Sequence, residues 1–417
     1  MLNPKGIIRQ LGFERLAGTT GEKKAVEVIT AHLDNLQLPY QTEVFSLTTF
    51  QPGEAVIEIN NRKFPARPYG LNRNTRLSGE FVYLDNPEIL ELNRGAYQGK
   101  IVMSCGFSRR LAPILKEAGV AAYINIGGPG REISSLSHRQ KSFREGYVPS
   151  VTIDHKLGEK LLAYQGENVS ISIKQKVQEA EALNIVVDIP GKGTDDNLIL
   201  VTAHYDSVAH SPGSSDNAGG TVTLLKVAEY FSRHKPGRDL RIIFFSGEEL
   251  GLLGSQAYAE KHREELKKRA ALIVNVDVSG DPVGFDTAFV LGTKELLGYF
   301  TGVVREKGIA FQSSLDIYSS DGMPFAVYEI PSVSISRRGG QANFFIHTSR
   351  DLPRYVSNRG LKNTINATIF FLQRVLDAGI FPVRREIDDS LREKIQKYLW
   401  NLTYEKPQLE WEDKYKR

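Results

Sequence analysis

The sequence is poor in the features that build disulfides and membrane spans. It holds one cysteine, Cys105, so no intrachain disulfide can form, which favours a reducing compartment. Its apolar runs fall well short of the roughly 20 residues that cross a bilayer. Residues 1–9 lack the apolar core of a signal peptide. We therefore expect a cytoplasmic protein with no membrane partner, although a secreted form trimmed of its leader would look the same.

An excess of charge of one sign is also missing. The 53 Lys and Arg residues against 49 Asp and Glu give a net charge of +4 over 417 residues, and no basic block stands out. The calculated pI of 8.8 is thus a weak argument for a nucleic-acid partner, and we expect none. Fractions of 41% apolar and 24% charged residues are typical of a folded globular protein, whose length favours two domains plus extensions.

Strands and helices alternate in the second half of the chain. Apolar strands are predicted at 184–191, 198–203, 240–245, 272–276 and 288–291, and helices at 218–234, 250–262, 294–307 and 359–378. A helix at 21–36 and a strand at 40–47 precede them. This pattern predicts an α/β fold with a mostly parallel, mixed central sheet and helices on both faces.

The chain between these parts has a different character. From about residue 48 to 180 it shows short β runs, many turn residues and few long helices, which predicts an inserted β-rich domain. We therefore expect a discontinuous α/β domain (1–47 and 184–385), an inserted domain (48–183) and a C-terminal helical extension (386–417).

The extension has apolar residues at helical spacing, followed by two tryptophans. These residues are Ile387, Leu391, Ile395, Leu399, Trp400 and Trp411. A docked helix is the simpler interpretation, and an arm that forms a homo-oligomer is the alternative.

Acids and histidines follow the ends of the predicted strands. Because ligands bind beyond the carboxyl ends of strands in open α/β sheets, we expect these side chains to converge. Two more such residues lie in loops, one before the helix at 218 and one late in the chain. The set comprises His204, Asp206, Asp216, Glu248, Glu249, Asp277 and His347.

Each of these residues also has a structural explanation when taken alone. Glu248 and Glu249 stand where a cap or a helix-dipole partner is common, Asp216 suits an N-cap, and a lone His347 is usually an ordinary loop residue. Five acids on one rim, however, would repel one another unless cations lay among them. Histidines and carboxylates without a thiolate suit zinc, with cobalt or manganese as substitutes. Several carboxylates, one of them bridging, suit a pair of ions.

The adjacent acids Glu248 and Glu249 suggest a division of roles. One carboxylate can bind metal while its neighbour takes a proton from water. Asp206, two residues after His204, points to the same face of the strand and can accept the outer imidazole N–H.

Several motifs carry a family resemblance. They are Val201–Ser207, Ser215–Gly220, Phe245–Gly251, Asn275–Asp277, Ser320-Asp321 with Pro324-Phe325, and His347-Thr348 with Asp351. In this order they resemble the M28 family of zinc aminopeptidases, over roughly residues 10–45 and 184–378. The section between is more loosely similar to the protease-associated (PA) domain inserted in many relatives, at Gly99–Val102, Gly119–Ala122 and Pro149–Val151.

The resemblance implies a phosphorylase/hydrolase-like zinc peptidase fold and an aminopeptidase acting on peptides with a free N-terminus. It implies His204 and Asp277 on one of two zinc ions, Glu249 and His347 on the other, and Asp216 bridging them. Glu248 would be the base that activates a metal-bridging water, with Asp206 behind His204. A cis peptide bond between Asp216 and Asn217 is also implied.

The sequence departs from the family just before the last histidine. Many relatives have a tyrosine there that steadies the oxyanion, whereas this chain has Ile346. Tyr318 or Arg337 could supply the donor instead. Residues 320–323 suit either a specificity pocket or an ordinary turn.

Three alternative functions remain open at this stage. A carboxypeptidase or dipeptidase of the same fold would need a cationic pocket, for which Arg337 and Arg338 are candidates. A glutaminyl cyclase shares the scaffold, but the Asp216–Gly220 run and the inserted domain favour a peptidase. A non-catalytic binding protein would have lost metal ligands that are intact here.

Overall fold

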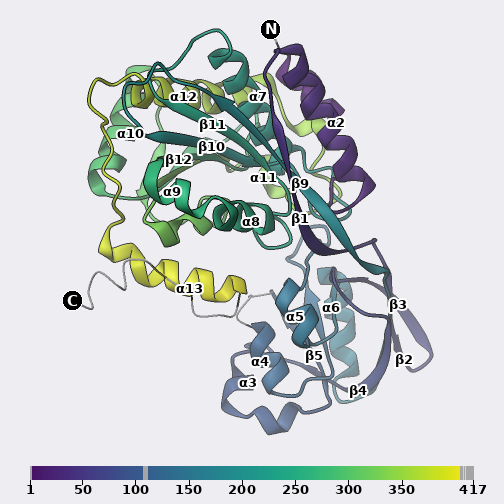
Figure 1. Ribbon diagram of the computed structural model, residues 1–417. Helices are drawn as coiled ribbons and strands as arrows, with labels where there is room; N and C mark the ends of the chain where they lie inside the picture. The colour runs from purple at the N-terminus through teal and green to yellow at the C-terminus, as the bar shows by residue number, and fades with distance from the viewer. Residues whose placement is uncertain (1, 107–110, 404–406, 408, 410–417) are drawn as a thin grey trace.

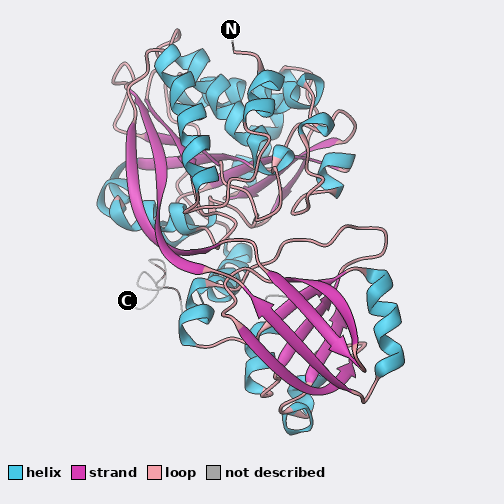
Figure 2. Cartoon of the chain, turned by 90° about the vertical axis from the view of Figure 1, so that its right-hand side faces the viewer, coloured by secondary structure: helices cyan, strands magenta, loops and turns pink. Residues whose placement is uncertain are grey.

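The computed structural model describes residues 2–106, 111–403, 407 and 409. Two bodies of β structure lie next to each other in this part of the chain, a layered α/β body and a barrel (Figures 1 and 2). Two long antiparallel strands, β1 (Gln41–Phe50) and β9 (Val177–Ile189), run from the first body towards the second. The chain therefore passes from the central sheet to the barrel, and back again, along this strand pair.

The central sheet is mixed, with parallel strands at its centre. Within the described residues it has eight strands in the order β1-β9-β11-β10-β12-β15-β13-β14. Neighbouring strands from β11 to β15 are parallel, whereas β9 and β13 pair with them in the antiparallel sense. The remaining bounds are β10 Leu198–His204, β11 Asp239–Phe245, β12 Ala270–Val276, β13 Phe285–Leu291, β14 Gln312–Leu315 and β15 Ser332–Arg338.

Helices cover both faces of this sheet, as predicted. One face packs against α1 (Pro4–Gln10), α2 (Thr20–Asn35), α7 (Gly219–Phe231), α10 (Lys294–Glu306) and α12 (Asn358–Leu376). The other packs against α8 (Leu253–Lys261) and α9 (Arg263–Arg269). No helix among the described residues is long and apolar enough to cross a membrane.

Local sequence explains where two of these helices begin. The side chain of Thr293 accepts the backbone N–H of Leu296 at the start of α10, and Ser357 does the same for Gly360 at the start of α12. A hydroxyl in this position satisfies one of the free N–H groups of the first helical turn.

Residues 54–174, named here the barrel segment, form a closed barrel with its own core. In the described residues its strands follow the order β2-β3-β7-β6-β5-β4-β8. They are β2 Glu54–Ile59, β3 Arg62–Pro68, β4 Thr75–Tyr83, β5 Ile101–Cys105, β6 Ala122–Ile126, β7 Ser150–Ile153 and β8 Asn168–Lys174. The accompanying α-helices are α3 Ile89–Leu92, α4 Leu111–Glu117, α5 Gln140–Glu145 and α6 His155–Leu161.

The central sheet extends beyond the predicted domain boundaries at 48 and 183, into the segment assigned to the inserted domain. Strand β1 continues to Phe50 and β9 begins at Val177, and these two residues pair with each other. The chain thus leaves the sheet for the barrel and returns to it at neighbouring points.

The C-terminal helix α13 (Arg392–Thr403) docks on the α/β body. Its residues Ile395, Leu399 and Leu402 are buried together with Leu252, Leu291, Met323 and Ala326. Its apolar stripe is therefore covered within the chain, as the docked interpretation predicts. Trp411 lies outside the described residues.

Candidate metal centre

The predicted site residues come from three neighbouring strand ends. His204 is the last residue of β10, Asp277 directly follows β12, and Glu248 and Glu249 lie just beyond β11. Because β11, β10 and β12 are adjacent in the sheet, these residues lie along one edge. Two loops complete the site with Asp216 and His347.

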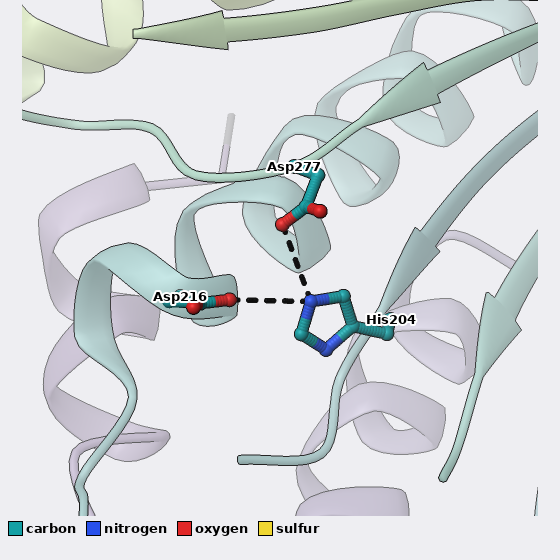
Figure 3. Close-up of side chains that lie close together, drawn as sticks. All are labelled: His204, Asp216 and Asp277. Carbon is teal, nitrogen blue, oxygen red and sulfur yellow. Dashed lines mark hydrogen bonds and ion pairs between the residues drawn. The ribbon is translucent and has the colours of Figure 1, made fainter. Parts of the chain in front are cut away.

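Two groups of three donors result, and they share one residue. His204, Asp216 and Asp277 offer donor atoms within 4.8 Å of one another, and so do Asp216, Glu249 and His347. Figure 3 shows the first group, in which both carboxylates point at one nitrogen of the imidazole ring. All five predicted ligands are therefore brought together.

Asp216 faces both histidines with different oxygens. Its Oδ1 lies 3.2 Å from Nε2 of His204, and its Oδ2 lies 3.1 Å from Nε2 of His347. Asp277 Oδ1 lies 3.2 Å from the same nitrogen of His204, while Glu249 Oε2 lies 3.3 Å from that of His347. Each group therefore contains one histidine and two carboxylates, and the two groups meet at Asp216.

This donor set fits a pair of zinc ions. Two donors bound to one tetrahedral zinc at about 2.0–2.2 Å lie about 3.4 Å apart, close to the separations found here. Histidine nitrogens and carboxylate oxygens are ordinary zinc ligands, and a carboxylate that offers one oxygen to each side can bridge two ions.

Asp206 connects two of the strand ends. Its Oδ1 lies 3.4 Å from Nδ1 of His204, on the side of the ring that faces away from the other carboxylates. The same carboxylate accepts the backbone N–H groups of Glu248 at 3.2 Å and of Glu249 at 3.3 Å. It therefore orients the imidazole and also holds the loop that carries both glutamates.

The loop around Asp216 is held by its backbone, and the side chain of Asp216 does not cap a helix. Helix α7 begins only at Gly219, and the neighbouring Asn217 is the residue whose Oδ1 accepts the N–H of Gly220 at 2.8 Å. The bond between Asp216 and Asn217 is cis, which confirms that expectation. Asp351 accepts the backbone N–H groups of Ser215 at 2.8 Å and of Asp216 at 3.0 Å.

A buried arginine beneath this loop was not predicted. Arg15 is fully buried and donates to the carbonyls of Tyr205 at 2.6 Å, Pro212 at 2.5 Å and Gly213 at 2.8 Å. Burial lowers its pKa to about 10, so it remains a cation beside the site carboxylates. Nothing in the sequence separates Arg15 from the many exposed arginines, because only the fold brings it behind the site.

Glu22 on α2 was also missed, and it links two strand ends. Its carboxylate accepts the hydroxyls of Ser246 at 2.5 Å and of Tyr205 at 3.0 Å, and the backbone N–H of Gly18 at 2.6 Å. Burial raises its pKa despite these bonds. Because Tyr205 follows His204 and Ser246 precedes the glutamate loop, Glu22 fixes both from behind.

Burial and neighbouring charges shift the pKa values of Glu248 and His204. Burial raises the pKa of Glu248 well above its ordinary value, and the nearby carboxylates of Glu249 and Asp277 raise it further, although His204 opposes them. Burial disfavours the charged form of His204, but its acidic neighbours outweigh this and raise its pKa. The pKa values of Glu248 and His204 are therefore both raised, the first mainly by burial and the second by its acidic neighbours.

The candidate oxyanion donors differ in their availability. The guanidinium of Arg337 is buried and occupied, since it donates to the carbonyl of Asp281 at 2.6 Å and to Asp286 at 2.8 Å. Tyr318 is half-buried near Asp277, whose charge adds to burial in raising the tyrosine's pKa. Arg338 lies over its ring, 5.0 Å from the centroid. Arg337 is therefore committed to the fold, whereas Tyr318 lies close enough to the site to feel the charge of Asp277.

Comparison with known proteins identifies the relatives of this chain. Residues 184–372 match Peptidase family M28. Aminopeptidase YwaD of Bacillus subtilis (strain 168) is 26% identical over 280 residues, which cover 64% of this chain and 58% of the relative. Leucine aminopeptidase 2 of Trichophyton equinum is 27% identical over 349 residues, covering 76% of this chain and 67% of the relative. The chain spans about half to three-fifths of the length of such curated relatives.

The fold is also found in a solved structure. A zinc aminopeptidase from Bacillus subtilis superimposes with a TM-score of 0.75 over 92% of this chain and 98% of that one, at 21% identity. The likeness therefore extends over both the α/β body and the barrel segment.

Proposed function

Because residues 184–372 form a Peptidase family M28 domain, we propose that this protein is a two-zinc aminopeptidase that hydrolyses N-terminal peptide bonds. The observation that carries the proposal is the carboxylate of Asp216, which turns one oxygen to each of two matching ligand groups. The names of the aminopeptidase relatives support the same reaction.

The five ligands divide into two sets around that carboxylate. His204 and Asp277 would hold one zinc ion, Glu249 and His347 the other, and Asp216 both. When bound, the ions would lower the pKa of water towards neutrality and polarise the scissile carbonyl. Cobalt or manganese would suit the same donors.

Glu248 is the proposed general base. It stands beside the ligand Glu249, but the contacts of the two donor groups do not use its carboxylate. Its raised pKa suits a group that takes a proton from the attacking water and returns it to the leaving amine. Asp206 keeps the loop of Glu248 and the ring of His204 in fixed relation during these transfers.

Tyr318 is the proposed oxyanion donor, in the place of the tyrosine that many relatives have where this chain has Ile346. A neutral phenol can donate to the developing negative charge on the substrate oxygen. Like any tyrosine it is protonated at neutral pH, and burial raises its pKa further.

A carboxypeptidase or dipeptidase of the same fold is the runner-up, and the pairing of Arg337 within the fold argues against it. Capture of a substrate carboxylate needs an available cation. Arg337 is buried against Asp286, and Arg338 lies over the rings of Phe289 and Tyr318. The acidic site instead suits the free amine of a peptide N-terminus.

We also propose that the barrel segment is a protease-associated domain inserted into the peptidase domain. Its closed barrel has a separate core, and the chain enters and leaves it through the paired ends of β1 and β9. The peptidase domain then comprises the residues on either side, followed by the docked extension.

Metal analysis and a substrate panel test the proposed function. We expect about two zinc ions per chain and cleavage of aminoacyl amides, with no release of C-terminal residues from N-blocked peptides. A protein without bound zinc that cleaves no aminoacyl amide would contradict the proposal. Release of C-terminal residues alone would establish the runner-up.

A further inference from the structure

His347 differs from the other candidate ligands in the way it is held. Its side chain is 37% exposed, whereas those of the other four are 1–7% exposed. It lies outside helices and strands, after the short helix α11 (Gln341–Phe344). Its φ of 61° is in the left-handed region, which residues other than glycine seldom adopt. Burial, which helps to fix the other four ligands, therefore does less to fix His347.

The barrel segment contacts the backbone on which His347 lies. The backbone N–H of Ser135 donates to the carbonyl of His347 itself at 2.8 Å. Arg131 Nη2 donates to the carbonyl of Phe344 at 2.9 Å, and its guanidinium lies 4.9 Å from the centroid of the Phe344 ring. Two backbone carbonyls of the histidine loop are thus bound by a part of the chain that lies far away in sequence.

A third contact binds the other side of the same loop. Ser349 Oγ donates to Oε2 of Glu132 at 2.7 Å. The contacting stretch is in turn tied to the barrel, because Arg67 of β3 donates to the carbonyl of Ile133 at 2.5 Å. The loop that carries His347 is therefore attached to a loop of the barrel segment before, at and after the histidine.

We propose that residues 131–135, named here the clamp, position His347 for zinc binding, so that one of the two zinc sites depends on the barrel segment. Arg131 and Glu132 are positioning residues, which act through the backbone of the histidine loop. The inference rests on the proposed two-zinc function. It adds that the affinity of the Glu249–His347 site depends on the clamp, while the His204–Asp277 site, built on the ends of β10 and β12, does not.

Removal of groups that support a metal ligand typically costs 10–100-fold in metal affinity. We therefore expect the Arg131→Ala/Glu132→Ala variant to release one of its two zinc ions at about 10-fold lower chelator concentration than the unmodified protein. The second ion should leave at an unchanged concentration. Arg131→Lys with Glu132→Gln, which keeps a donor and an acceptor, should restore most of the lost affinity.

The measurement is zinc content by elemental analysis across a chelator titration of the full chain, with circular dichroism as a check of folding. The matched control is Arg94→Ala/Glu117→Ala, which breaks an exposed 2.8 Å ion pair of the same barrel segment. If the titration curves of the Arg131→Ala/Glu132→Ala variant coincide with those of this control, the proposed role of the clamp is wrong. Loss of both ions together would also overturn it, because it would indicate a general effect on the fold. If the unmodified protein itself binds fewer than two zinc ions, the proposed function fails first.

Discussion

Asp351 holds the backbone of Asp216, since its Oδ2 accepts the N–H of that residue at 3.0 Å. The bridging ligand is thereby fixed by a carboxylate that binds no metal in our proposal. Burial and the charge of Asp216 raise the pKa of Asp351 to about 7, although Arg15 and two backbone N–H groups oppose them.

Asp351→Asn should therefore weaken metal binding without removing a ligand. The amide can accept with one oxygen only, so one of two N–H groups loses its partner, and we expect a 10–100-fold loss of zinc affinity. Competition with a fluorescent chelator measures this. Asp377→Asn is the control, because Asp377 also accepts a backbone N–H, that of Gly237 at 2.8 Å. Equal zinc affinities in the two variants would contradict a role at the site.

The two adjacent glutamates should separate by their effects. Glu248→Gln should lower kcat by several orders of magnitude and leave zinc content nearly unchanged, because it removes the base and keeps every ligand. Glu249→Gln should lower both kcat and zinc content, since Oε2 of Glu249 belongs to the His347 group. Elemental analysis alongside turnover of an aminoacyl amide distinguishes them. Equal loss of zinc in both variants would refute the division of roles.

Tyr318→Phe should lower kcat by about 100-fold with little change in KM or zinc content, as expected for the loss of one oxyanion donor. Tyr299→Phe provides the control, because its hydroxyl donates to the carbonyl of Arg374 on the helical face. Unchanged kcat in Tyr318→Phe would remove Tyr318 from the mechanism.

His138 should make the fold sensitive to acid. It is buried between the rings of Tyr69 and Tyr147, and burial lowers its pKa to about 3. The unfolded chain takes up the proton near pH 6.5 and the folded chain only near pH 3, so stability is complete above pH 6.5 and falls as the pH drops.

His138→Phe keeps a ring and removes the titrating group. Between pH 7 and pH 5 we expect the free energy of unfolding to fall by about 2 kcal/mol less in this variant than in the unmodified protein. Urea unfolding at both pH values measures the difference. His155→Phe, at a position on α6 that is about one-third exposed, should show no such protection. The same acid sensitivity in both variants would contradict the assignment to His138.

Much of the architecture could be predicted from sequence. Apolar runs followed by acids and histidines predicted the central parallel strands. They also predicted that the candidate ligands lie at one edge of the sheet. Strand β15 was missed, although it lies between β12 and β13. Its serines Ser332, Ser334 and Ser336 are buried, so the strand lacks the continuous apolar run of its neighbours. The short elements β14, α1, α9 and α11 of the α/β body were missed as well, because few residues carry their periodicity.

The supporting groups of the site could not be predicted. Arg15 and Glu22 lie near the N-terminus and reach the site only because α2 and the segment before it pack behind β10 and β11. The clamp lies in the barrel segment, whose contact with His347 depends on how two bodies meet. Local pattern reveals ligands that follow strands, but it does not reveal partners that come from distant parts of the chain.

The pairing of β1 with β9 has a consequence for synthesis on the ribosome. Gln41 pairs with Val186, and every residue of the barrel segment is made between them. The first strand of the sheet must therefore wait, unpaired, until the barrel has emerged. Contacts so far apart in sequence form slowly because a long loop has to close first. The barrel shortens that loop once it has folded, since its two ends then lie together. In the newly made chain, the sheet can therefore be completed only after the whole barrel segment has been synthesised.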